Sequence, residues 1–397
     1  MYEAHLNERN RDWDWPLLLA TGALGVVGVL FIFSATGEGA QTQPLYRQTF
    51  FLQLLWIAVG LGAAAAACLA DYGKLARWSR VVYWGAMAAL VAVLVMGKVV
   101  LGGKRWLSLG FINIQPSEFA KIAFIFVLAD FLSRPVEELR QPRVFFAALG
   151  YAALPFVLIL REPDLGSALV FLSVCLAMMF VAGVPNRYLG KLAGCVVPVV
   201  GVMLALILYG PGNLNIVKPY QKVRLLSFFG VGNRKDKTDK KETEAARREM
   251  EAASYNVNQS LISVGSGGMF GKGWRQGTQH ELRYLPQAGA SNDFIFSVIA
   301  EEEGFVGSVV ILALYSVLLL SGIKVAAQAR DRLGQLLAIG VVTLLFTHVF
   351  INIGMNIRLM PVTGIPLPLL SYGGSSVVCS LIAIGVLHNV HMYRNSY

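Results

Sequence analysis

The sequence predicts an all-α, polytopic membrane protein. Of its 397 residues, 55% are hydrophobic and only 15% are charged, whereas a soluble domain carries about 25% charged residues. The hydrophobic residues fall in runs of about twenty, the length with which a helix crosses the apolar part of a bilayer. This composition excludes an ordinary soluble enzyme. The formal net charge of +10 is expected from basic residues in cytoplasmic loops, so we predict no nucleic-acid partner.

Ten runs are long and apolar enough to be transmembrane helices. In chain order they are Trp15 to Ala35, Gln48 to Ala70, Val81 to Gly97, Pro116 to Ser133, Val144 to Leu160, Leu165 to Val184, Leu189 to Tyr209, Phe305 to Gly322, Gln335 to Gly354 and Ser375 to Met392. An even number of helices puts both termini on one side of the membrane. The short loops on that side carry fourteen Lys and Arg residues, and the short loops on the other side carry six. Because cytoplasmic loops are enriched in Lys and Arg, we expect both the N- and C-termini to be cytoplasmic.

One long connection, residues 210–292, separates the seventh and eighth predicted helices, and the helix count makes it extracytoplasmic (periplasmic). We treat it as a loop within a single membrane domain that covers residues 1–397. Its middle, residues 234–251, holds seven basic and six acidic residues, which is typical of a solvated helix or a disordered insert. The part that follows interleaves glycines with aromatic residues over 265–284, and this pattern favours an ordered, tight loop.

Two segments depart from straight membrane helices. A single helix from Asp293 to Lys324 would be half as long again as the apolar core of a bilayer is thick, and it would place three consecutive glutamates in its middle. We therefore expect an outer half-helix from Asp293, a break near Gly304 and then the membrane span. Residues 355–374 are apolar but contain three prolines. Such backbone is tolerated at membrane depth only where protein surrounds it, so we predict a re-entrant segment between the ninth and tenth helices.

Charged residues gather near the predicted outer end of the fourth helix. Glu118 and Lys121 are three residues apart in the run QPSEFAK at 115–121, and they therefore share one face of the helix. Ionisable groups inside a membrane are costly, and they usually pair or face a polar cavity. The pair is thus either a structural ion pair or the floor of a polar cavity. Just before it, Lys104 and Arg105 suit an anionic group such as a diphosphate, with a solvated turn as the alternative.

Two acids occur where an outer loop meets an apolar helix. Asp164, in the run REPDLG, either caps the next helix or lines the same cavity, where it would face a cation or a sugar hydroxyl. Asp293 ends the glycine-rich loop, at a boundary where burial can raise a carboxyl pKa toward the range of a general base; an N-cap is the alternative. Ser371 and Ser375 end the proline-rich segment, where they would form an anion site at a helix start, a helix cap, or both.

Taken together, these runs resemble the SEDS family (shape, elongation, division and sporulation). The resemblance is carried, in the family's order, by QPSEFAK at 115–121, EPDLGSA at 162–168, the glycine-rich run at 265–279, DFIFSVIAEE at 293–302 and PVTGIPLPLLSYGGSS at 361–376. It extends from about Trp15 to Val390. The runs at 277–279, 352–356 and 361–366 are similar to the elongation (RodA-like) branch rather than the division (FtsW-like) branch. The run PQAGASND at 286–293 departs from the family, which usually has a shorter PExHTD.

The resemblance implies a peptidoglycan glycosyltransferase in the bacterial cytoplasmic (inner) membrane, with its active site facing the periplasm. Its substrate would be lipid II, a disaccharide-pentapeptide on undecaprenyl diphosphate, and its partner a class B penicillin-binding protein. A divalent cation, Mg²⁺ or Mn²⁺, would assist, with Asp164 as a candidate ligand. The family's essential aspartate corresponds to Asp293, which we assign as the general base of an inverting transfer. The remaining motif residues that would bind substrate correspond to Arg105, Trp106, Glu118 and Lys121, next to Lys104, Ser371 and Ser375 assigned above.

Three other functions fit parts of the pattern. A lipid II flippase or transporter would also have ten helices with broken segments and a polar cavity, but here the polar residues cluster at the predicted outer ends. A non-catalytic scaffold of a cell-wall complex would not need Asp293 to be charged. The division-specific polymerase would have the same chemistry as the elongation enzyme. The sequence holds no Walker motif and no dinucleotide-binding fingerprint, so ATP-driven transport is not supported.

Overall fold

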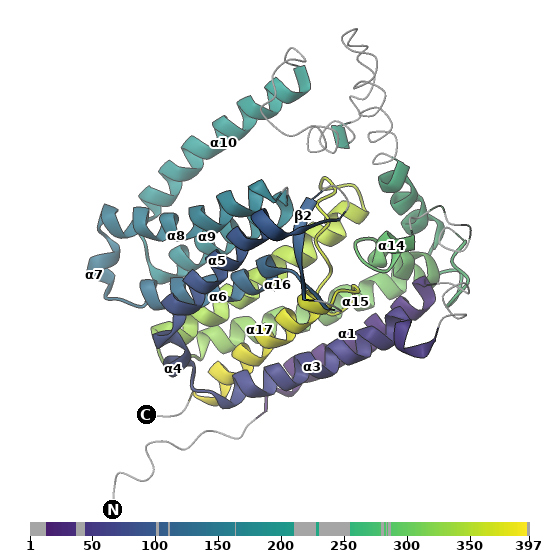
Figure 1. The fold of residues 1–397 in the computed structure, drawn as a ribbon, viewed down its shortest axis with the longest axis horizontal. Helices are drawn as coiled ribbons and strands as arrows, with labels where there is room; N and C mark the ends of the chain where they lie inside the picture. Colours follow the sequence, from purple (N-terminus) through teal and green to yellow (C-terminus); the bar gives the residue numbers. More distant parts are fainter. Residues whose placement is uncertain are drawn as a thin grey trace, which may run out of the picture.

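The computed structural model describes residues 13–36, 44–100, 103–109, 112–162, 164–209, 228–229, 255–278, 282, 284 and 287–394. The charged insert predicted at 234–251 lies outside these residues. The described chain forms a bundle of long helices (Figure 1). They are α1 (Trp15–Ala35), α3 (Thr49–Leu69), α5 (Ser79–Met96), α6 (Pro116–Leu132), α8 (Pro142–Arg161), α9 (Leu165–Ala182), α10 (Asn186–Tyr209), α15 (Ile295–Ala327), α16 (Arg332–Asn356) and α17 (Gly374–Met392).

Most of these helices have the length and composition of membrane spans. Within the described residues, eight helices are long and apolar enough to cross a membrane. The other two long helices are α6, which has 17 residues and is mostly buried, and α10, which has 24 residues. The protein is therefore a multi-pass membrane protein, and its helices agree with the ten spans that the sequence predicts.

Two helices occupy the centre of the bundle, and one stands apart. α17 is buried along nearly its whole length and packs against α3, whereas α16 packs against α6, α9 and α15. Figure 1 shows α10 running away from the other helices, and in the described chain it contacts α9. The carboxylate of Asp14, just before α1, lies 3.9 Å from Nδ1 of His391 in the last turn of α17. Both termini of the bundle therefore lie at one end, as an even number of crossings requires.

A small β-sheet adds to the all-α architecture, and the sequence analysis did not predict it. Strands β1 (Lys98–Val100), β2 (Gly103–Leu109) and β3 (Ile112–Ile114) follow α5 and form an antiparallel sheet in the order β1-β2-β3. Val99 pairs with Lys104, and Ser108 pairs with Asn113. β1 and β3 have only three residues each, too few for a clear alternation of polar and apolar residues, which explains why periodicity did not reveal the sheet.

Short helices connect the long ones. They are the 3-10 helix η1 (Leu45–Arg47), α4 (Tyr72–Arg77), α7 (Val136–Leu139), α14 (Gln287–Ala290) and a helix over 255–266. Three serine and asparagine side chains join the 255–266 helix to the bundle. The Ser260 hydroxyl lies 2.6 Å from that of Ser297 on α15, and it donates to the side-chain oxygen Oδ1 of Asn356 on α16 at 3.2 Å.

The predicted break in the eighth span is confirmed at Gly304. This residue has φ 67° and ψ −157°, and it divides α15 into a short first part and a longer second part. The N–H groups of Phe305 and Val306, which follow the break, donate to the carbonyls of Gly268 and Met269. On the other side of the break, the N–H groups of 272 and 273 donate to the carbonyls of 301 and 302. The described part of the glycine-rich loop, up to residue 278, is therefore ordered, as expected, because the break frees backbone groups for it.

Replacing Gly304 by alanine should destabilise the protein by roughly 2 kcal/mol or more, because only glycine readily adopts this backbone conformation. A Cβ atom there would also lie 2.3 Å from the backbone nitrogen of Gly271. Gly62→Ala on α3 is the matched control, since a Cβ at that position meets nothing within 4 Å. The measurement is the free energy of unfolding of the purified protein. Equal stabilities of the two variants would refute the role given to the break.

The proline-rich segment after α16 is irregular and buried, as predicted. Its backbone at Leu369 and Leu370 lies against Gly28, within α1. The carbonyl of Pro368 accepts a hydrogen bond of 2.5 Å from the hydroxyl of Tyr315, in the longer second part of α15. Non-helical backbone at this depth needs protein around it, and α1 and α15 supply that cover.

Candidate active site

Asp293 lies at the end of the bundle opposite to the termini, in the turn that precedes α15. Its backbone carbonyl accepts hydrogen bonds from the side-chain amides of Asn352 at 3.0 Å and Asn356 at 3.1 Å. The N-cap of α15 is Phe294, so the alternative assignment of Asp293 as the helix cap is wrong. Two asparagines of α16 therefore fix the backbone of Asp293, while its carboxylate belongs to a partly exposed side chain.

The carboxylate of Asp293 lies against the irregular segment 362–366. A Cβ atom at Gly364 would be 3.4 Å from Oδ2 of Asp293. The carbonyl of the next residue, Ile365, accepts a hydrogen bond of 2.8 Å from Asn352. The same asparagine therefore holds both the backbone of Asp293 and the segment beside its carboxylate.

Asp164 serves as a helix cap and also belongs to this cluster. Its carboxylate accepts hydrogen bonds of 3.0 Å from both the N–H and the hydroxyl of Ser167, and it lies 3.7 Å from the guanidinium of Arg105. Two residues later, the backbone of Gly166 lies so close to Thr363 and Ile365 that a Cβ atom there would be 2.7 Å from their side chains. The segment 362–366 thus contacts both the turn that carries Asp164 and the carboxylate of Asp293.

Glu162 is a second acid beside Asp164 that the sequence analysis missed. Its side chain is buried, and neither carboxylate oxygen has a hydrogen-bond partner among the described residues. Burial raises the pKa of Glu162 to about 8, and the nearby negative charge of Asp164 adds to this effect, while Arg105 opposes it. Arg105 also donates a hydrogen bond of 3.3 Å to the backbone carbonyl of Glu162. Arg105 therefore interacts with both residues, with the carboxylate of Asp164 and with the backbone of Glu162.

Glu118 and Lys121 form a buried ion pair on α6, with 2.7 Å between the ammonium and a carboxylate oxygen. The ammonium also lies 2.9 Å from Nε2 of His348 on α16. His348 was not predicted, although the spacing of His348, Asn352 and Asn356 by four residues on an apolar helix indicates a shared polar face. This face of α16 connects the Lys121 pair to Asp293.

Ser371 and Ser375 both have partners within the protein. The hydroxyl of Ser371 accepts from the N–H of Leu367 at 2.8 Å and donates to the carbonyl of Asn292 at 2.6 Å. The hydroxyl of Ser375 accepts from the N–H of Gln115, just before α6, at 3.1 Å. These bonds fix the proline-rich segment beside Asp293 and join α17 to α6; a contact of either hydroxyl with diphosphate stays a prediction.

The other predicted binding residues lie on β2. Lys104 pairs with Val99, and Trp106 pairs with Lys98, through the backbone register of the sheet. The side chain of Lys104 lies outside what the structure describes, whereas those of Arg105 and Trp106 are partly exposed. Lys104 and Arg105 therefore lie in a strand rather than in the solvated turn given as the alternative, and the strand places Arg105 beside Asp164.

The carboxylates of Glu162 and Asp164 suit a divalent cation that shares its coordination with a substrate. In the described part of the chain, no group of three or more His, Cys, Asp or Glu side chains is arranged to hold a metal ion. Mg²⁺ is often bound by one or two carboxylates together with substrate phosphates and water. The unpartnered oxygens of Glu162 and the neighbouring Asp164 therefore fit an ion that the protein and the substrate coordinate together, rather than an ion held by protein ligands alone.

Comparison with known proteins shows that the chain is similar to one family and to several individual proteins. A family model described as "Cell cycle protein", covering FtsW, RodA and SpoVE, matches residues 15–396. The chain is 32% identical to the peptidoglycan glycosyltransferase RodA of Treponema pallidum, covering 96% of this chain and 98% of that protein. It is 36% identical to the stage V sporulation protein E of Bacillus subtilis, covering 96% and 97%. A chain in a solved peptidoglycan synthase complex that coordinates polymerization and crosslinking is 27% identical, with a TM-score of 0.77 over 98% of this chain and 100% of that one.

Proposed function

Because the chain belongs to the family of cell cycle proteins that comprises FtsW, RodA and SpoVE, we propose that it is a peptidoglycan glycosyltransferase that polymerises lipid II. The observation that carries the mechanism is the position of Asp293. Its carboxylate lies beside Gly364, in the segment that also contacts the Asp164 turn and is held by Asn352. An acid with a fixed backbone, next to a basic and acidic cluster, is suited to acid–base chemistry.

In the proposed reaction, Asp293 takes the proton from the 4-hydroxyl of the acceptor's terminal GlcNAc. The oxygen attacks the anomeric carbon of the donor's MurNAc, so that a new C1–O4 bond forms. The bond from C1 to the diphosphate breaks, and its electron pair leaves with undecaprenyl diphosphate. Attack from the face opposite to the leaving group converts the α-linked donor into a β-1,4-linked glycan.

The leaving group needs charge compensation rather than a proton. Arg105 and Lys104 on β2 would bind the diphosphate, since guanidinium and ammonium groups pair well with phosphate oxygens. A divalent cation on Asp164 and Glu162 would neutralise further negative charge. Trp106, next to Arg105, would cover the sugar or the lipid-linked end of the substrate.

The buried polar residues of α6 and α16 would orient this site. The Glu118–Lys121 pair lies against His348, one turn of α16 before the asparagine that binds segment 362–366, and none of the three is exposed. We propose that these three residues keep the segment 362–366 in position and balance the charge near it, so that the Asp293 carboxylate keeps its orientation toward the acceptor.

The proposed setting is the bacterial inner membrane, with the site on the periplasmic side and both termini in the cytoplasm. This orientation follows from the excess of Lys and Arg in the loops on the side of the termini. A class B penicillin-binding protein is the proposed partner, by analogy with the structurally similar chain of a peptidoglycan synthase complex. We assign the chain to cell elongation and rod shape, since three of its motif runs are similar to the RodA-like branch.

The decisive experiment incubates the purified protein in detergent with labelled lipid II, alone and with a class B penicillin-binding protein. Glycan strands longer than one disaccharide are the expected product, and the partner should increase their yield. A flippase would return lipid II unaltered under both conditions, and that result would refute the proposed activity.

A further inference from the structure

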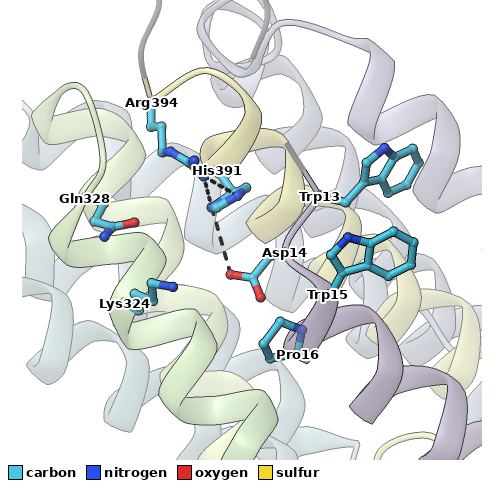
Figure 2. A pocket seen from close by; sticks show the side chains of 8 residues that line it. All are labelled: Trp13, Asp14, Trp15, Pro16, Lys324, Gln328, His391 and Arg394. Carbon is cyan, nitrogen blue, oxygen red and sulfur yellow. Dashed lines mark hydrogen bonds and ion pairs between the residues drawn. The ribbon is translucent and has the colours of Figure 1, made fainter. Parts of the chain in front are cut away.

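A polar cavity lies at the end of the bundle opposite to Asp293, among the start of α1 and the ends of α15 and α17 (Figure 2). Its volume is about 510 Å³. Its lining includes Trp13, Asp14, Lys324, His391 and Arg394. The cavity is too far from the proposed active site to belong to it, because it lies at the other end of the same helices.

Two basic side chains, those of Lys324 and Arg394, line this cavity together with one carboxylate, that of Asp14. Asp14 is buried and already engaged, since one carboxylate oxygen accepts from the N–H of Leu17 at 3.1 Å and the other lies 3.9 Å from His391. Arg394 contacts the His391 ring at 2.8 Å. Lys324 is exposed, and no carboxylate lies within ion-pair distance of its ammonium in the described part of the chain. Figure 2 shows Lys324 on α15 facing Asp14 and His391 across the cavity.

An apolar groove adjoins the cavity and shares one wall with it. The groove has a volume of about 930 Å³, lies among α1, α3 and α17, and is lined mainly by aliphatic side chains such as Leu18, Leu61 and Leu381. Trp13 lines both the groove and the cavity, and its ring lies 5.1 Å from that of His388. A tryptophan between a polar and an apolar compartment is typical of the membrane–water interface.

We propose that the cavity and the groove together bind one anionic phospholipid. The phosphate diester would lie between Lys324 and Arg394, and an acyl chain would follow the groove along α1 and α3. Basic pockets between transmembrane helices bind anionic headgroups in this way. A zwitterionic headgroup fits less well, because its own ammonium would compete with the two basic side chains for the phosphate. The proposal does not depend on the glycosyltransferase activity.

The headgroup half of the proposal is tested by native mass spectrometry of the full-length protein after delipidation. Phosphatidylglycerol and phosphatidylethanolamine with identical acyl chains are titrated separately. Phosphatidylglycerol should bind on the order of tenfold more tightly, and Lys324→Gln/Arg394→Gln should remove that preference. Lys74→Gln/Arg77→Gln on α4 is the matched control, because it removes the same charge from exposed residues outside the cavity. Equal affinities for the two lipids, or an unchanged preference in the Lys324/Arg394 variant, would overturn the proposal.

The binding of the lipid's acyl chain in the groove is tested by a second pair of variants. Ala65→Trp fills the groove, whereas the neighbouring Ala66→Trp adds the same ring at an exposed position outside it. The first should weaken phosphatidylglycerol binding about tenfold, and the second should leave it unchanged; identical affinities would overturn the assignment of the groove. Thermal unfolding in lipid-free detergent checks that all variants are folded. Displacement of the lipid by millimolar inorganic phosphate would assign the cavity to a free anion and would also overturn the proposal.

Discussion

Asp293→Asn should reduce lipid II polymerisation by about 10²- to 10⁴-fold, the range over which a general base contributes to a rate. The amide keeps the size of the carboxyl and cannot accept the proton from the acceptor hydroxyl. The backbone carbonyl of Asp293, which binds Asn352 and Asn356, is untouched by the substitution, so the turn should remain in place. The measurement is the initial rate of glycan strand formation from labelled lipid II.

The matched control for this variant is Asp130→Asn. Asp130 lies on α6, with 34% of its side chain exposed, and it forms a 3.9 Å ion pair with Arg80. Removal of a carboxylate there should leave the rate close to that of the unchanged protein. Unfolding temperatures of both variants should match the parent, which separates loss of chemistry from loss of fold. A normal polymerisation rate in folded Asp293→Asn would remove the general base from the mechanism.

Lys121→Met should destabilise the protein by about 3–5 kcal/mol, because it leaves the buried carboxylate of Glu118 without its partner. Both side chains of the pair are almost fully buried, at 3% and 4% exposed, so water cannot compensate for the lost charge. The apparent unfolding temperature in detergent should fall by several degrees, and polymerisation should be lost. Arg80→Gln, which breaks an exposed ion pair, should change stability by at most about 1 kcal/mol.

The double variant Glu118→Leu/Lys121→Met distinguishes stability from function. It removes both charges, and replacement of a whole buried ion pair by apolar side chains is often close to neutral for stability. We therefore expect the unfolding temperature to recover while polymerisation stays low, because His348 and the segment 362–366 lose the charge that orients them. Recovery of polymerisation together with stability would mean that the pair is purely structural.

The sequence could predict those features that depend on neighbouring residues. The length and composition of the apolar runs gave the helices, and the excess helix length around Glu301 required the break at Gly304. The prolines in 355–374 excluded a lipid-exposed helix, and the irregular buried segment followed from that. The position of Asp293, at the junction of a glycine-rich loop and an apolar helix, likewise marked it as a candidate from local pattern alone.

Only the tertiary structure determines which of the candidate site residues contact one another. Arg105, Asp164 and Asp293 come from three distant parts of the chain. Arg105 pairs with Asp164, and the segment 362–366 contacts both the Asp164 turn and Asp293. The contact of His348 with Lys121 and the joining of Lys324 and Arg394 at one cavity also arise from helix packing. Periodicity and spacing describe the chain over a few turns, whereas these contacts depend on which helix faces are placed side by side. The sequence by itself therefore determined the elements and the candidate base, and the fold determined the surroundings in which that base would act.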